Sequence, residues 1–179
     1  MGIYVAFLRA INVGGHTVTM DRLRRLFESA GASDVETVIA SGNVVFASSS
    51  RNVPALEKRI AAHLESSLGY AVATFVRTPE ELARVATHRP FERAELEGAG
   101  HTLFVGFHGR EADAVARRRV LALESDLDAF HFRGREVYWL CRGRTSDSKV
   151  YGGGLEKALG QPATVRNVTT DRKIAEKYG

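Results

Sequence analysis

The sequence predicts an α+β protein made of two consecutive ferredoxin-like (α/β-plait) units, each β-α-β-β-α-β with an antiparallel sheet. Two observations indicate this fold class. Short apolar runs of strand length alternate with longer segments in which apolar residues recur every three or four positions, and this order occurs twice along the chain. The 179 residues, 44% hydrophobic and 26% charged, suit one large domain or two small ones. We expect a first plait over residues 1–77, a helix and linker over 78–100, and a second plait with a closing helix over 101–179.

The first plait has two helices with recognisable ends. Thr19 can cap a helix that Gly31 stops, and Asn52 with Pro54 opens a second helix that Gly69 closes. Its strands are expected at residues 3–8, 35–39, 44–46 and 70–76.

The middle segment begins with a capping box. Thr78 and Glu81 have the required spacing, and Pro79 occupies the first helical position, so a short helix to about residue 87 is expected. Residues 89–100 are polar and contain glycine, which is typical of a linker.

The second plait repeats the order with weaker signals. Its strands are expected at residues 102–107, 127–132, 137–141 and 163–165. Its helices are expected at residues 111–124, 150–159 and 171–178. The helix over 150–159 is weakened by three consecutive glycines, and the strand over 137–141 is apolar on both faces.

Two loops of the first plait are expected at one edge of its sheet, because the first and second strands of such a unit run parallel. The candidate ligand-binding residues on these loops are Arg9, Asn12, Gly14, Gly15, His16, Ser41 and Asn43. A Gly-Gly loop before a helix lets backbone N–H groups approach an anion closely. The alternative is structural, because Gly-Gly also permits a simple turn and Ser-Gly-Asn is a common hairpin turn. Neither phosphate-binding glycine motif is present.

A second candidate cluster lies in the C-terminal half. It comprises Lys149, Arg166 and Asn167, which flank the glycine-bearing helix. Spacing alone favours ordinary helix ends with solvated charges here.

Three segments resemble a bacterial family, domain of unknown function 1697. They are residues 4–15 (YVAFLRAINVGG), residues 41–46 (SGNVVF), and a C-terminal block of residues 148–149, 155–160, 163–167 and 170. Ala10 stands where the family usually has glycine, and Val168 where it usually has an aromatic residue. The resemblance implies a paired α/β-plait fold and no established reaction.

Charge and motifs leave three functional hypotheses. The leading one is binding of a small phosphate- or carboxylate-bearing ligand at the loop edge of the first plait, with the second cluster contributing if the plaits face each other. The second is nucleic-acid binding, because the net charge of +4 comes entirely from residues 101–179 and includes a run of three arginines at 117–119. The RNA-recognition signature is absent, however. The third is a homodimeric interaction scaffold without a ligand.

Several classes are disfavoured. The six histidines form no metal motif and no acid–base pair is visible, so we expect no metal and no cofactor, and assign no catalytic residue. Cys141 is the single cysteine and no apolar run is long enough to cross a bilayer, which predicts a cytoplasmic protein without membrane contact.

Overall fold

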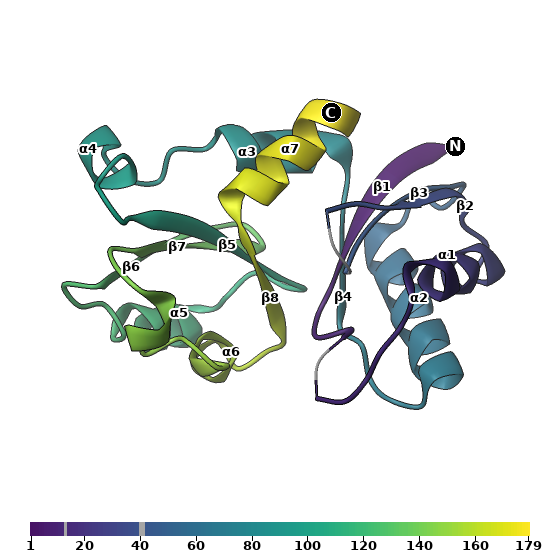
Figure 1. The fold of residues 1–179 in the computed structure, drawn as a ribbon, viewed down its shortest axis with the longest axis horizontal. Helices are drawn as coiled ribbons and strands as arrows, with labels where there is room; N and C mark the ends of the chain where they lie inside the picture. The colour runs from purple at the N-terminus through teal and green to yellow at the C-terminus, as the bar shows by residue number, and fades with distance from the viewer. Residues whose placement is uncertain (13, 40–41) are drawn as a thin grey trace. The chain divides into compact units, whose positions relative to one another are not determined.

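The fold consists of two four-stranded antiparallel sheets with helices, in the order β-α-β-β-α-β twice, as the sequence predicted. The computed structural model describes residues 1–12, 14–39 and 42–179. The chain divides into two compact units, Met1–Val85 with Lys173–Gly179, and Ala86–Arg172 (Figure 1).

The first unit has the strand order β2-β3-β1-β4, the ferredoxin-like arrangement. Its strands are β1 (Gly2–Leu8), β2 (Ser33–Thr37), β3 (Asn43–Ser48) and β4 (Thr74–Arg77). Its helices are α1 (Met20–Ser29), α2 (Val53–Leu68) and α3 (Pro79–Thr87), the last of which ends beyond the unit boundary. Both β1 and β2 pair antiparallel with β3, so they run in the same direction.

The helix starts follow the expected capping residues. Thr19 Oγ1 accepts the amide of Arg22, and Asn52 Oδ1 accepts the amide of Ala55. The capping box is confirmed, since the amide of Thr78 donates to Glu81 Oε2 at 2.9 Å and the amide of Glu81 donates to Thr78 Oγ1 at 3.1 Å. Each bond satisfies an amide that the helix itself leaves without a partner.

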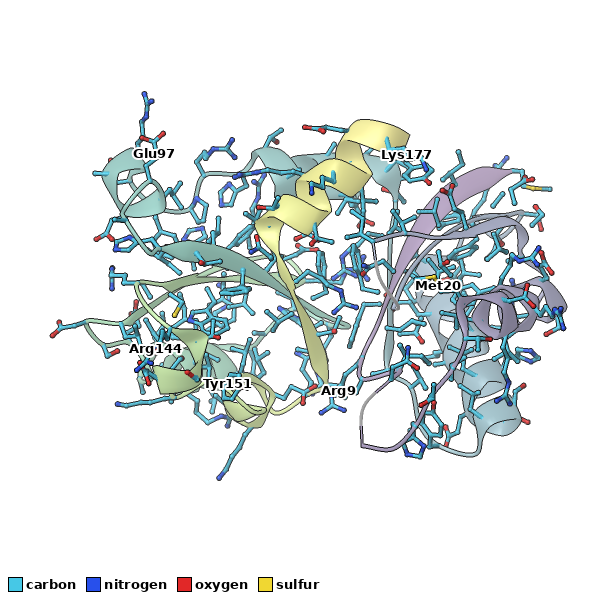
Figure 2. The ribbon with its side chains drawn as sticks, in the orientation of Figure 1. Arg9, Met20, Glu97, Arg144, Tyr151 and Lys177 are labelled. Carbon is cyan, nitrogen blue, oxygen red and sulfur yellow. The ribbon has the colours of Figure 1, made fainter. Side chains whose placement is uncertain are left out.

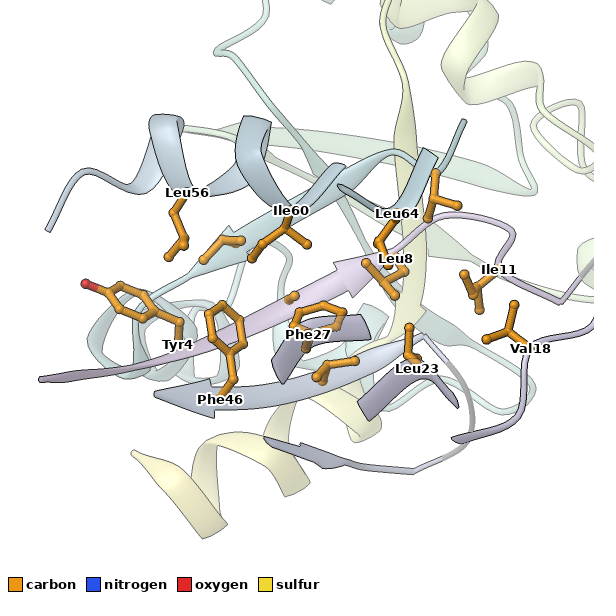
Figure 3. Close-up of a cluster of buried hydrophobic side chains, with 14 residues drawn as sticks. Tyr4, Leu8, Ile11, Val18, Leu23, Phe27, Phe46, Leu56, Ile60 and Leu64 are labelled. Atoms are coloured by element: carbon orange, nitrogen blue, oxygen red, sulfur yellow. The ribbon is translucent and has the colours of Figure 1, made fainter. Parts of the chain in front are cut away.

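One face of the first sheet packs on α1 and α2 (Figure 3). Phe27 of α1 is fully buried there and meets Phe46 of β3 edge to face, with ring centroids 5.4 Å apart. Leu56, Ile60 and Leu64 recur every four residues along α2, so a single stripe of that helix covers the sheet.

The second unit has the equivalent order β6-β7-β5-β8. Its strands are β5 (Thr102–His108), β6 (Asp128–Arg133), β7 (Glu136–Cys141) and β8 (Ala163–Asn167). Its helices are α4 (Arg93–Leu96), α5 (Ala114–Leu121), the 3-10 turn η1 (Thr145–Asp147), α6 (Gly154–Leu159) and the start of α7 (Val168–Tyr178).

Three elements of the second unit differ from expectation. The helix expected over 111–124 is shorter and spans Ala114–Leu121. Residues 89–100, expected as a linker, contain the short helix α4. The helix expected over 150–159 is confined to Gly154–Leu159, because Gly152 and Gly153 adopt φ of 76° and 100°, outside the right-handed helical region.

The two faces of the second sheet are covered by different elements (Figure 1). Helices α5 and α6 pack on the face that carries Phe104, Trp139 and Phe130. On the opposite face, register places His131, Tyr138, Val105 and Arg166 in one row across all four strands. The segment before β5 and the start of α7 lie on this second side. In the described part of the chain, no helix is both long and apolar enough to cross a membrane.

Candidate functional site

The two candidate loops of the first unit meet at one edge of its sheet. The amide of Leu8, at the end of β1, donates to the carbonyl of Gly42 at 2.7 Å. Arg9 follows directly and is exposed (Figure 2). Ser41, the other candidate on the second loop, lies outside the described residues.

Two candidate asparagines at this edge hold the loops in shape. Asn12 Oδ1 accepts the amide of Val18 at 2.6 Å. Asn43 is 2% exposed, and its amide group donates to the carbonyls of Val38 and Ile39. These side chains therefore stabilise turns.

The Gly-Gly loop is open to solvent. Gly14 and Gly15 have φ of 66° and 83°, a conformation that strongly favours glycine, and both are exposed. His16 is exposed and stacks on Tyr70, with ring centroids 3.8 Å apart. Among the described residues of the first unit, the exposed candidates are thus Arg9, Asn12, Gly14, Gly15 and His16.

Ala10 adopts φ of 53°, in the same left-handed region. This conformation explains why glycine suits the position better than alanine. We expect Ala10→Gly to raise the free energy of unfolding by about 0.5 kcal/mol, because relief of left-handed strain exceeds the added chain entropy of the unfolded state. Urea titration followed by circular dichroism measures it, with Ala71→Gly, at an exposed position before β4, as the control. If Ala10→Gly destabilised the protein as much as the control does, the backbone strain assigned to Ala10 would be contradicted.

The candidates of the second unit lie in different environments. Lys149 is exposed in the turn before α6. Arg166 is half-buried on β8, where Nη1 donates to Thr164 Oγ1 at 2.6 Å and to the carbonyl of Val165. Burial lowers the pKa of Arg166 from its ordinary value.

Ser148, next to Lys149, has a structural role. Its hydroxyl donates to the buried carboxylate of Asp128, 2.9 Å from either oxygen. The indole of Trp139 donates to Asp128 Oδ1 at 2.7 Å, and the amide of Val150 donates to Ser148 Oγ. Asp128 therefore links β6 and β7 to the turn before α6.

Asn167 lies beside a cavity within the second unit. The cavity has a volume of about 550 Å³, and its walls come from residues 89–103 and 167–172. Asn167 Oδ1 accepts the amide of Thr169 at 2.9 Å, so it caps the first turn of α7. The positive end of the α7 dipole therefore lies at the cavity wall.

Two arginines converge at this cavity. Arg89 Nη1 donates to the carbonyl of Ala86 at 3.2 Å, and Arg172 Nε donates to the same carbonyl at 3.3 Å. A single oxygen atom thus holds two guanidinium groups near each other. Among the described residues, neither group has a carboxylate within salt-bridge distance, and both line the cavity.

Neighbouring charges compensate this pair only in part, because the carboxyl of Asp171 acts on Arg172. Burial and then the charge of Arg89 lower the pKa of Arg172. The adjacent Asp171 is fully buried, and burial raises the pKa of its carboxyl well above the usual range. Arg93 also lines the cavity but pairs with Glu97, Nε to Oε1 at 2.9 Å. Among the described residues, Arg89 and Arg172 are therefore the arginines of the wall that have no salt bridge.

The cavity wall before β5 is anchored to the sheet. Glu95 of α4 pairs with Arg142, which follows β7, at 2.9 Å between Oε2 and Nε. The hydrogen bond to Arg142 lowers the pKa of Glu95. The His101 ring lies 2.6 Å from the carbonyl of Glu95, which holds the end of the segment.

A family model described as "Protein of unknown function (DUF1697)" matches residues 1–138. The chain belongs to this family. The match includes the loop edge of the first unit and the 89–103 wall of the cavity, and ends before the 167–172 wall.

A solved structure shares the architecture over the whole chain. It is the conserved bacterial protein SP0830 from Streptococcus pneumoniae, with a TM-score of 0.75 and 20% sequence identity over 99% of this chain and 98% of that one. At this identity the likeness concerns the fold alone. No curated protein matches the chain.

Arg89 was missed from sequence because residues 89–100 are typical of a linker, and Arg172 because it falls within the closing helix expected over 171–178. Two signals in the chain pointed toward them. Arg89 and Arg93 flank Phe91, an unusual aromatic in a polar stretch, and Asn167 directly precedes a helix start.

Proposed function

We propose that this protein binds a small anionic ligand in the cavity of its second unit. The single observation that supports this best is the convergence of Arg89 and Arg172 on the carbonyl of Ala86, without a carboxylate partner among the described residues. Arg89 is exposed and Arg172 half-buried, so water screens part of the repulsion between the two charges, and a bound anion would offset what remains.

Several features favour an oxyanion as that counter-ion. Arg172 uses only Nε to reach Ala86, which leaves its terminal nitrogens for a ligand. The first turn of α7 adds a partial positive charge at the same wall. The cavity volume lies within the range of small-molecule sites.

The loop edge of the first unit is the second candidate for the same function. Arg9 supplies charge there, and the exposed backbone of Gly14 and Gly15 supplies N–H groups. It is less favoured, because the side chains of Asn12 and Asn43 are already committed to the loops.

Nucleic-acid binding through the arginine run is supported less well. Arg117 pairs with Glu111 at 2.9 Å and lies over the ring of Phe132. Arg119 donates to the carbonyl of Ala158. Two of the three arginines are therefore engaged by the protein itself.

Thermal melting with sodium pyrophosphate tests the proposal, against sodium chloride at equal ionic strength. We expect the melting temperature to rise with pyrophosphate concentration, because a ligand that binds only the folded state stabilises it by mass action. Arg89→Gln and Arg172→Gln should each remove most of the rise.

The matched control is Arg118→Gln, an exposed arginine on α5, on the other face of the second sheet. It should retain the full rise. No rise beyond that in sodium chloride, or an equal rise in all four proteins, would refute the cavity as the site.

A further inference from the structure

The cavity has an apolar wall as well as a cationic one. Phe91, Leu96, Leu103 and Val168 line it together with the arginines. Leu103 projects from β5 on the same sheet face as Val105, and Val168 is the first residue of α7.

The ring of Phe91 is half-buried and lies at the end of a row of rings. It meets the ring of His131 edge to face, with centroids 6.5 Å apart. His131 in turn lies beside His88, at 5.3 Å between centroids, and His88 beside Tyr138, at 5.0 Å. Burial, and then the nearby charges of Arg133 and His131, lower the pKa of His88.

We propose that the ligand is an aromatic phosphomonoester, an inference that rests on the proposed function. Its phosphate lies against Arg89 and Arg172 at the start of α7, and its ring lies against Phe91 and Leu103. The charge matches, because a phosphomonoester is close to a dianion at neutral pH and the two guanidinium groups have no salt bridge among the described residues.

The apolar residues of the cavity wall favour a ligand that carries an aromatic ring. An inorganic anion would leave the half-buried side chains of Phe91 and Leu96 in contact with water inside a cavity of about 550 Å³, whereas Leu103 and Val168 are already buried. A flat apolar group removes that surface from water and can stack on Phe91 at little conformational cost.

Isothermal titration calorimetry with two monoesters tests this inference. Phenyl phosphate and methyl phosphate carry the same head group and differ in the ring. We expect phenyl phosphate to bind about tenfold more tightly, from the apolar area that the ring buries. Phe91→Ala should cost about that tenfold for phenyl phosphate and leave methyl phosphate within about twofold.

Phe91→Leu is the matched variant, since it keeps an apolar side chain and removes the ring, and it should give an intermediate loss. Melting of each variant without ligand shows that the fold is retained. Equal binding of the two esters, or an equal loss of both in Phe91→Ala, would overturn the aromatic ligand and leave the anion site intact. Binding of neither ester would overturn both proposals.

Discussion

Asp128→Ala is expected to lower the free energy of unfolding by about 3 kcal/mol. The carboxylate is buried and accepts hydrogen bonds from the indole of Trp139 and the hydroxyl of Ser148. Alanine would leave both donors buried without a partner, and each stranded donor costs about 1–3 kcal/mol. The turn before α6 would lose its attachment to β6 at the same time.

Urea titration followed by far-ultraviolet circular dichroism measures this change. Asp126→Ala is the matched control, because Asp126 is exposed and only two residues away, and its effect should stay within about 0.5 kcal/mol. Asp128→Asn should fall between them, since its amide oxygen can still accept one of the two bonds. A loss below about 1 kcal/mol for Asp128→Ala would contradict the role assigned to this carboxylate.

Phe27→Ala is expected to cost about 4 kcal/mol in the first unit. Phe27 is fully buried between α1 and the sheet and meets Phe46 edge to face (Figure 3). Removing the ring loses the free energy of transferring it from water into the core. The side chains that surround the resulting cavity also lose their contacts with the ring.

The same urea titration measures this effect, with Arg25→Ala, exposed on the same helix, as the control. Trp139, the single tryptophan, lies in the second unit, so its fluorescence follows that unit while circular dichroism follows both. A midpoint by circular dichroism that matches the control would contradict the placement of Phe27 in the core.

The fold was predictable because its signals are local. The capping residues Thr19, Asn52 and Thr78 mark helix starts through bonds to amides three residues ahead, which spacing alone reveals. The juxtaposition of Leu8 and Gly42 also followed from strand direction in a β-α-β-β unit. Helix boundaries near runs of glycine were less predictable. The helix expected over 150–159, for example, is limited to Gly154–Leu159 in the structure.

The cavity was not predictable because its walls are distant in sequence. Arg89 and Arg172 are 83 positions apart, and both are fixed by the carbonyl of Ala86, which carries no side-chain signal. Asn167 was selected for its place in a loop cluster, and the structure adds the cavity beside it. Local patterns cannot reveal that a polar segment packs along a sheet beside a helix start.

The most direct test of the anion site is a titration of the ¹⁵N-labelled protein with sodium pyrophosphate, followed by nuclear magnetic resonance. We expect the backbone amides of residues 102–103 and 167–170 and the side-chain Nε signals of Arg89 and Arg172 to shift together with one dissociation constant. Shifts at Gly14 and Gly15 with the cavity signals unmoved, or no saturable shift anywhere, would contradict the assignment of the ligand to the second unit.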